Sequence, residues 1–241
     1  MNIGVIFAGG VGSRMHSKER PKQFLDIYNK PIIVHTIEHF QECCDIDIVV
    51  VVCIEEWIDY CNDLIYQYRL NKVKRVVKGG ASGQLSIYNG LKAAEELASD
   101  DDAIVLIHDG VRPLISSDLL SENVRDVKKY GSSITSSIVK ETIVEIYDNG
   151  DVKSVPDRAH SRVAKAPQCF KLKDILNAHN RALNEGKKDF IDSCSMMKYY
   201  GFQLHMTEGP YENIKITTPD DFYTMRAILE AKENAQIYGF E

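Results

Sequence analysis

Apolar runs alternate with amphipathic stretches through the first half of this chain of 241 residues. A run such as Ile-Val-Val-Val-Val, with no polar position, is typical of a strand that is buried on both faces of a sheet. The pattern predicts strands at residues 3–7, 46–53, 73–78 and 103–107. Between them, apolar residues at helical spacing predict helices at 31–41, 56–68 and 84–98. This alternation across short turns indicates an α/β fold with a doubly wound, mainly parallel twisted sheet.

The second half departs from this rhythm at residues 133–172. Two alternating runs, 143–147 and 152–155, flank Asn149-Gly150, which is a strong hairpin signal. We therefore expect one domain over residues 1–241 with a projecting β-hairpin arm at about 140–160. A lone two-stranded arm is marginally stable in water, so we expect it to pack on a second subunit, giving a homodimer. Further helices are predicted at 171–185, 192–200 and 218–234, and strands at 202–207 and 213–217.

Composition narrows the class of protein. The chain is 44% hydrophobic and 27% charged, with a formal net charge of -6. An acidic protein lacks the broad basic face that nucleic acids and anionic membranes require. No apolar span is long enough to cross a membrane, the N-terminus resembles no signal peptide, and six cysteines show no metal-binding spacing. These features predict a cytoplasmic protein with free thiols.

The first predicted strand ends in a loop of small residues, Ala8-Gly9-Gly10-Val11-Gly12. Such a loop leaves backbone N–H groups uncovered and can wrap an anion. Four cations follow within nine residues: Arg14, Lys18, Arg20 and Lys22. The third glycine of a dinucleotide fingerprint is replaced by Met15, and no P-loop string occurs in the chain. A polyphosphate is the ligand that this loop suits best.

Two more unusual segments follow predicted strands. One is the small-residue turn 79–83, and the other is His108-Asp109-Gly110-Val111-Arg112-Pro113. Because ligands of parallel sheets bind outside the carboxyl ends of the strands, we expect both segments to meet the first loop. Asp109 could hold a Mg²⁺ ion that neutralises a triphosphate, or it could cap its turn and pair with Arg112. In the predicted strand 213–217, Asn213, Lys215 and Thr217 share one face.

Together these segments resemble, over almost the whole chain, the family of methylerythritol-phosphate and ribitol-5-phosphate cytidylyltransferases. The matching blocks lie in the same order as in the family, and residues 22–26 (Lys-Gln-Phe-Leu-Asp) look closer to the ribitol-phosphate branch, which serves teichoic acids and capsules. The matching blocks are Ala8–Met15 with Pro21–Phe24, Gly79-Gly80 with Ser86 and Gly90-Leu91, His108–Pro113, Pro167-Gln168, and Asn213–Lys215 with Thr217.

The resemblance implies a Rossmann-like nucleotidyltransferase that transfers CMP from CTP to a polyol phosphate, which attacks the α-phosphorus while pyrophosphate leaves. It implies that Arg14, Lys22 and Lys215 surround the triphosphate as catalytic cations and that Asp109 binds Mg²⁺. The nucleotide would contact Ala8, Gly9, Gly10, Gly12, Gly80, Ala81, Ser86 and Gly110. The polyol phosphate would contact Thr142, Arg158 and Asp192, with Arg158 lent to the site of the neighbouring subunit.

Two departures from the family pattern bear on the substrate. Gly83 stands where family members commonly carry an arginine, and Ala166 where a threonine is common. The second change favours ribitol 5-phosphate as acceptor over methylerythritol 4-phosphate, with a glycerol phosphate as a further alternative. A nucleotide-binding regulatory subunit without turnover is the non-enzyme alternative, but such a protein would not need Arg14, Lys22, Asp109 and Lys215 together.

Overall fold

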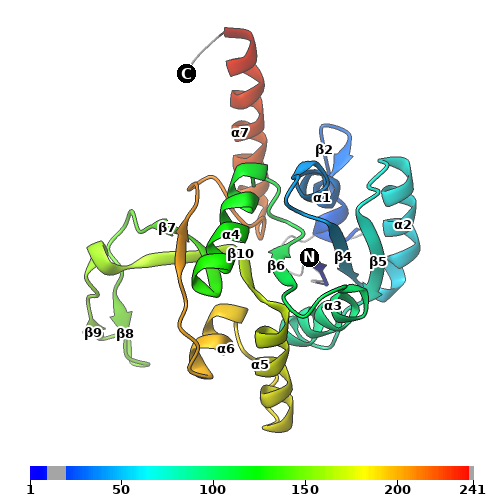
Figure 1. The fold of residues 1–241 in the computed structure, drawn as a ribbon. Coiled ribbons are helices and arrows are strands. Elements are labelled where there is room, and N and C mark those ends of the chain that lie inside the picture. The colour runs from blue at the N-terminus through cyan, green and yellow to red at the C-terminus, as the bar shows by residue number, and fades with distance from the viewer. Residues whose placement is uncertain (10–19, 239–241) are drawn as a thin grey trace.

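A computed structural model describes residues 1–9 and 20–238. In this part of the chain, seven strands form the central sheet in the order β11-β7-β10-β6-β1-β4-β5. β10 runs antiparallel to β6 and β7, and every other neighbouring pair is parallel. The predicted mainly parallel α/β sheet is therefore confirmed (Figure 1). The strands are β1 (Asn2–Ala8), β4 (Ile48–Cys53), β5 (Val73–Lys78), β6 (Ile104–Asp109), β7 (Ser132–Ile138), β10 (Arg162–Lys171) and β11 (Met206–Glu208).

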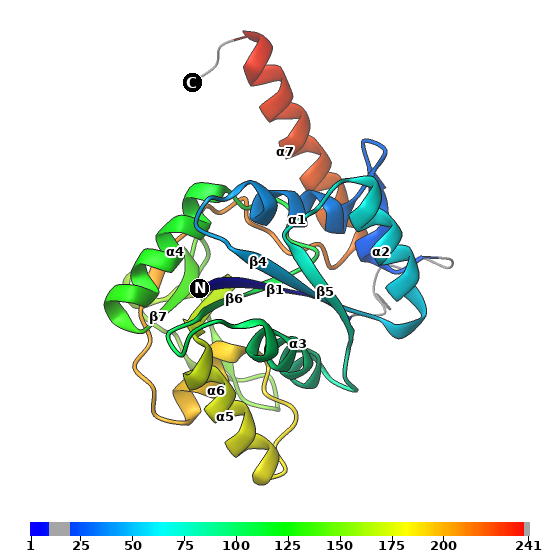
Figure 2. The same ribbon diagram turned by 45° about the vertical axis from the view of Figure 1, so that its right-hand side comes forward.

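Helices cover both faces of the sheet, as the doubly wound topology requires (Figure 2). One apolar cluster joins α1, α2 and α4 to the sheet, and a second joins α3, α5 and α6 to the opposite face. The helices are α1 (Ile32–Glu42), α2 (Ile58–Gln67), α3 (Gly83–Leu97), α4 (Ser117–Tyr130), α5 (Leu172–Asn184), α6 (Ser193–Tyr199) and α7 (Pro219–Tyr238). No helix within the described ranges is long and apolar enough to span a membrane.

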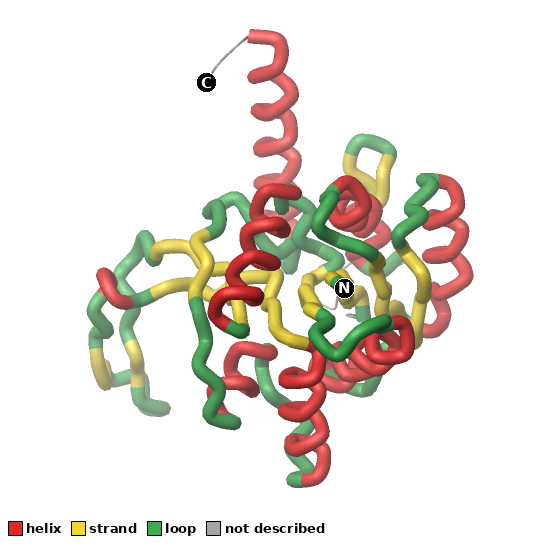
Figure 3. Tube along the Cα trace, in the orientation of Figure 1, coloured by secondary structure: helices red, strands yellow, loops and turns green. Residues whose placement is uncertain are grey.

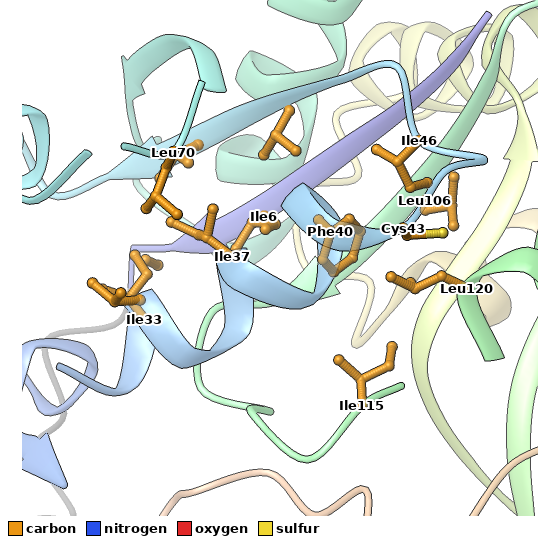
Figure 4. Packing of buried hydrophobic residues seen from close by; sticks show 14 of the residues in the cluster. Ile6, Ile33, Ile37, Phe40, Cys43, Ile46, Leu70, Leu106, Ile115 and Leu120 are labelled. Atoms are coloured by element: carbon orange, nitrogen blue, oxygen red, sulfur yellow. The ribbon is translucent and has the colours of Figure 1, made fainter. Parts of the chain in front are cut away.

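The central strands divide their side chains between the two layers. In β4 all six residues are buried, with Val49 and Val51 in one cluster and Val50 and Val52 in the other. This two-residue alternation is the strand period, and it explains why an unbroken apolar run was needed here. On the first face, Phe40 of α1 packs toward Leu106 of β6, as Figure 4 shows. The core therefore fixes the sheet from both sides.

The predicted hairpin is present. β8 (Glu145–Ile146) pairs antiparallel with β9 (Val152–Ser154), and Gly150 has a φ of +88° in the turn between them. The pair forms a separate small sheet set to one side of the central sheet (Figures 1 and 3). Exposed apolar side chains cover this arm: Ile143, Val144, Ile146, Tyr147, Val152 and Val155.

Short elements complete the chain, and one predicted strand is wrong. Residues 213–217 form no strand; they follow an irregular path, with a hydrogen bond from Ile216 N to Val111 O. The strand predicted at 202–207 is confined to β11. The remaining elements are β2 (Asp26–Ile27), β3 (Lys30–Pro31) and the 3₁₀ turns Lys22–Phe24, Glu55–Trp57 and Arg158–His160.

Candidate active site

The carboxyl ends of three parallel strands meet at one rim of the sheet. Gly110, after β6, donates its N–H to Phe7 O in β1 at 3.0 Å. Gly79, after β5, donates to Cys53 O at 2.8 Å, and a Cβ atom on Gly79 would lie 3.9 Å from the Cα of Gly9. The loops after the first, third and fourth predicted strands therefore come together, as their composition suggested.

The turn after β5 is held against the start of α3 by Ser86. The Ser86 hydroxyl accepts a hydrogen bond from Gly80 N at 3.0 Å and donates to Ser82 O at 2.9 Å. A Cβ atom on Gly80 would lie 2.5 Å from the Cβ of Leu85, so only glycine fits here. Ser82 caps the helix by accepting from Leu85 N. The arrangement leaves a tight backbone turn at a helix N-terminus, where anions are stabilised.

Asp109 is the buried carboxylate at the rim that pairs with two cations. It ends β6, and its side chain is 7% exposed. Arg112 Nε lies 2.7 Å from Oδ2, and Lys215 Nζ lies 2.5 Å from Oδ1. Burial by itself would raise the pKa of the Asp109 carboxyl, but the charges of Lys215 and Arg112 outweigh it and lower that pKa to about 2. The carboxylate is therefore ionised at neutral pH and holds two cations beside the loops.

Lys22 joins the N-terminal basic segment to residues 213–217, which we call the closing segment. Its buried Nζ donates a hydrogen bond to Ile216 O at 2.9 Å, while Ile216 N donates to Val111 O at 2.9 Å. Next to it, Gln23 Nε2 donates to Ala8 O at 2.6 Å, which ties the basic segment to the end of β1. Cations from opposite ends of the chain, Lys22 and Lys215, thus belong to one rim.

Two hydrogen bonds hold residues 213–217 on their irregular path. Arg112 Nη1 donates to Asn213 O at 3.0 Å, and the fully buried Asn213 donates from Nδ2 to Ala166 O at 2.7 Å. The expectation that Asn213, Lys215 and Thr217 share one strand face is therefore wrong. Asn213 points into the protein, whereas Lys215 reaches Asp109.

A cavity of about 230 Å³ adjoins these charges. Asp192 belongs to it, but its carboxylate also caps α6 by accepting from Ser195 N at 2.8 Å and accepts from Gln168 Nε2 at 2.9 Å. The cavity is lined by Phe7, Gly83, Gln84, Ile87, Ile107, Asp109, Arg112, Ala164, Lys165, Ala166, Gln168, His179, Phe190, Ile191, Asp192, Ser193, Met196 and Lys215.

Sequence reasoning missed one cation of this cavity, Lys165. The residue is 7% exposed, and Nζ donates to Tyr211 O at 2.7 Å. Burial, and then the charge of Arg112, lower the pKa of the Lys165 ammonium. The one signal in the sequence that pointed to Lys165 was its position next to Ala166, which is one of the two departures from the family pattern.

The structure separates two predicted acceptor residues from this cavity. Arg158 donates to Lys140 O at 3.2 Å, and it is exposed, as is Thr142. Neither of them lines the cavity of their own chain. Gly10, Gly12 and Arg14 lie outside the described residues. Gly83 lines the cavity, and a Cβ there would meet nothing within 4 Å, so the missing arginine leaves open space.

The predicted Mg²⁺ site can be tested against the carboxylates present. Among residues 1–9 and 20–238, no group of three or more His, Cys, Asp or Glu side chains is arranged to hold a metal ion. Mg²⁺ is commonly bound by one or two carboxylates together with substrate phosphates and water. Asp109 fits that pattern as a single ligand, provided that Lys215 leaves Oδ1.

Comparison with known proteins places the chain among similar sequences along its whole length. The family model of 2-C-methyl-D-erythritol 4-phosphate cytidylyltransferase, IspD, matches residues 3–231. A protein of Streptococcus agalactiae serotype III named ribitol-5-phosphate cytidylyltransferase is 56% identical over 239 residues, which cover 99% of this chain and 100% of that protein. A Clostridium botulinum protein named 2-C-methyl-D-erythritol 4-phosphate cytidylyltransferase is 39% identical, covering 95% of this chain and 97% of that protein.

A solved structure shows the same fold. The 4-diphosphocytidyl-2C-methyl-D-erythritol synthase of Anaerococcus prevotii superposes with a TM-score of 0.81 at 26% identity. The superposition covers 95% of this chain and 96% of that one. This chain and the solved relative therefore share one fold.

Proposed function

The chain belongs to the IspD family of cytidylyltransferases, and from that premise we propose that it transfers CMP from CTP to D-ribitol 5-phosphate, giving CDP-ribitol and pyrophosphate. The observation that carries the proposal is the meeting of Lys22, Asp109 and Lys215 at one rim, in a chain 56% identical to a protein named ribitol-5-phosphate cytidylyltransferase. The similar proteins are named cytidylyltransferases, which are nucleotidyltransferases, so we set the regulatory-subunit alternative aside.

The chemistry asks little of the protein beyond fixed charge. The attacking phosphate of the acceptor is already an anion, so no general base is required. The difficulty is to bring two anions together and to stabilise the charge that develops at phosphorus. Lys22 and Lys215, supported by Arg14, bind the triphosphate and this developing charge, and the loops at Gly9, Gly80 and Gly110 hold the nucleoside.

Mg²⁺ is part of the proposal. When bound, it would neutralise charge on the triphosphate, with Asp109 as its ligand from the protein. Lys215, the cation that Asp109 holds at Oδ1, would then be available to the phosphates of CTP. Asp109 therefore positions a cation as well as offering an oxygen ligand.

The acceptor follows from the most similar relatives that we compared. Relatives named for methylerythritol phosphate are more distant, at 39% identity. Ala166 in the cavity wall stands where family members commonly carry a threonine, which favours an acceptor other than methylerythritol 4-phosphate, and Lys165 beside it offers a cation to the acceptor's phosphate. We place the enzyme in the cytoplasm, in the supply of activated ribitol for a teichoic acid or capsule. Methylerythritol 4-phosphate, the substrate in the family's name, is the second candidate.

An acceptor panel tests the proposal. The purified protein with CTP and Mg²⁺ receives ribitol 5-phosphate, methylerythritol 4-phosphate or a glycerol phosphate, and pyrophosphate is measured. We expect ribitol 5-phosphate to give the highest kcat/KM. A higher value for methylerythritol 4-phosphate would assign the second candidate instead. UTP and ATP in place of CTP test the choice of base.

The arm supplies a reason for a homodimer. Ile146 and Val152 are each 62% exposed, and Tyr147 is 55% exposed, on a hairpin too small to be stable alone. A second copy of this chain would bury these side chains. Arg158, at the base of the arm and away from the cavity of its own chain, would then reach the acceptor site of its partner.

Changing Arg158 to Ala should raise KM for ribitol 5-phosphate on the order of tenfold, because a charge-assisted hydrogen bond to phosphate is lost. KM for CTP should change less. Arg162→Ala is the matched control, since Arg162 is also an exposed arginine and its side chain donates to Ala159 O and Ser161 O, in the turn just before β10. Steady-state kinetics with each substrate varied in turn provide the measurement. A larger change in KM for CTP would remove Arg158 from the acceptor site.

Mixing two impaired variants tests the shared site, with ribitol 5-phosphate kept well below its KM, so that Arg158→Ala alone shows only about one tenth of the wild-type rate. If Arg158 acts in the partner's site, a dimer of one Arg158→Ala and one Lys22→Ala chain contains one intact site. A statistical mixture should then recover about one quarter of wild-type activity. Recombination is followed by refolding the mixed chains and measuring pyrophosphate release. A mixture whose rate stays at the average of the two separate variants although sedimentation shows mixed dimers would contradict sharing, as would a fully active wild-type monomer.

A further inference from the structure

His179 is a buried polar residue that the site assembled above does not use. It lies on α5, is 1% exposed and lines the same cavity as Asp109. Neither Nδ1 nor Nε2 has a hydrogen-bond partner in the part of the chain that the structure describes. Buried polar atoms are nearly always paired, so two unpaired nitrogens on one ring need an explanation.

The other deep polar groups of this cavity are already engaged with the protein. Gln84 donates to Lys187 O at 3.0 Å and accepts from Phe190 N at 3.0 Å. Gln168 donates to Asp192 and accepts from Cys194 N at 2.8 Å. His179 therefore differs from its neighbours in the cavity, because its hydrogen-bonding capacity remains open to a ligand.

The chemical state of the ring defines what it can bind. Burial lowers the pKa of the His179 imidazole to about 4, so the ring is neutral at neutral pH. A neutral imidazole presents one N–H donor and one nitrogen acceptor. A hydroxyl group, which both donates and accepts, matches such a ring, whereas a phosphate is better placed beside fixed cations.

The cavity separates these two kinds of partner. Arg112, Lys165 and Lys215 supply positive charge in one part of its lining. The rest of the lining includes Ile87, Phe190 and Met196, which pack in the core cluster of the helical layer that contains α5, and no charged group of the described residues contributes to the lowered pKa of His179. A molecule with a phosphate at one end and hydroxyl groups along the rest suits this division.

The nucleotide is a poorer match for this position. The described residues that the family resemblance assigns to the nucleoside are Ala8, Gly9, Gly80, Ala81, Ser86 and Gly110. None of them lines the cavity that contains His179. Asp192, which is assigned to the acceptor, does line it. Asp109 and Lys215, which the resemblance assigns to the metal ion and the triphosphate, also line it, so the cavity extends from the triphosphate to the acceptor side of the rim.

We propose that His179 binds a hydroxyl group of the acceptor's polyol chain, away from its phosphate, and so contributes to the selection of a polyhydroxylated acceptor. The inference rests on the proposed function, since ribitol 5-phosphate is the acceptor. His179 takes no part in the transfer step. Its contribution is to acceptor affinity, and it should leave the binding of CTP almost unchanged.

Kinetics of His179→Phe test the inference, because phenylalanine keeps a flat ring and removes both nitrogens. We expect KM for ribitol 5-phosphate to rise on the order of tenfold, with KM for CTP unchanged within about twofold. His179→Gln should recover part of the loss. Tyr88→Phe is the matched control, since Tyr88 contacts the His179 ring from α3 and its hydroxyl bonds Asn180 outside the cavity.

A second measurement does not depend on turnover. The ring nitrogens of His179 are followed by ¹⁵N NMR with a non-reactive α,β-methylene analogue of CTP bound. Addition of ribitol 5-phosphate should shift them, and addition of inorganic phosphate should not. Unchanged KM and unshifted signals would leave His179 as a histidine that binds only buried water, and equal losses for both substrates would make it structural; either result overturns the inference. Failure of the wild type to form CDP-ribitol would instead overturn the proposed function.

Discussion

Replacing Lys22 with Ala should lower kcat on the order of 10² to 10³, because one of the cations that we propose to act on the developing charge is lost. Lys22 is buried against the closing segment, where Nζ donates to Ile216 O. The same contact orders the backbone beside Lys215, so KM for CTP should rise as well. Pyrophosphate release under saturating CTP and ribitol 5-phosphate gives kcat, and circular dichroism checks the fold.

Lys72→Ala separates this effect from the loss of any partly buried lysine. Lys72 Nζ also donates to a backbone carbonyl, Cys43 O, but it belongs to the segment that leads into β5 and lines no part of the cavity. We expect this variant to keep wild-type turnover. A folded Lys22→Ala protein with unchanged kcat would remove Lys22 from the mechanism.

Changing Asp109 to Asn should impair both stability and turnover. The change keeps the size of the side chain but leaves Arg112 and Lys215 without their common anion. Breaking a buried ion pair from one side costs about 3 kcal/mol, which corresponds to a fall in Tm of about 6 to 12 °C for a domain of this size. Turnover should fall on the order of 10² or more, because Lys215 is no longer positioned. Calorimetry and pyrophosphate release measure the two effects.

The effect of Asp109 on stability should depend on pH in one direction. Its pKa in the folded protein is about 2, below the ordinary value of 3.8. The carboxylate therefore stabilises the fold fully above about pH 4, and this contribution is lost as the pH falls toward 2. Urea unfolding with a chelator present, at about pH 6 and about pH 3, should show the difference between wild type and Asp109→Asn shrinking in acid.

Asp102→Asn is the matched control. Asp102 also pairs with two lysines, Lys171 and Lys173, but its side chain is 79% exposed. Surface pairs contribute little, so we expect a change within about 0.5 kcal/mol. Equal losses for the two variants would show that burial of Asp109 is not what gives its ion pairs their strength.

The strands around the site could be predicted because they are buried on both faces. β1, β4 and β6 have no solvated face, so their sequences carry continuous apolar runs that few other elements share. The hairpin could be predicted because Asn149-Gly150 specifies a tight turn. In each case one local signal was sufficient and the surrounding structure agreed with it.

β7 was not predicted because its burial is polar. Its sequence is Ser-Ser-Ile-Thr-Ser-Ser-Ile, and six of the seven residues are buried. Ser133 donates to Asn123 Oδ1 at 2.7 Å, and Thr207 of β11 donates to Asp126 at 2.7 Å. The stabilising partners are polar groups of α4, which directly precedes the strand, and of β11, which is distant in sequence, so a hydrophobic pattern cannot reveal this strand.

α4 could have been predicted from signals that are present. Ser116 caps its start by accepting from Leu119 N, and Gly131 ends it with a φ of +84°. β10 had weaker signals, since Arg162, Lys165 and Pro167 interrupt its apolar residues. Lys165 therefore did not stand out as a site residue.

The arrangement of the candidate site was predicted in part. Motifs identified Asp109, Lys22 and Lys215, and the topology rule brought their loops together. The contact of Lys215 with Asp109 needed tertiary information, because it depends on the path of residues 213–217, which Asn213 and Arg112 determine. His179 lies in an amphipathic helix, where a buried histidine resembles any core residue.

Quantifying CDP-ribitol and pyrophosphate formed from CTP and ribitol 5-phosphate, by the wild type and by the double variant Lys22→Ala/Lys215→Ala, tests the central claim most directly. The account predicts that the wild type forms the two products one for one and that the folded double variant loses at least about 10³-fold in rate. No CDP-ribitol from the wild type, or formation at the wild-type rate by the double variant, would contradict it.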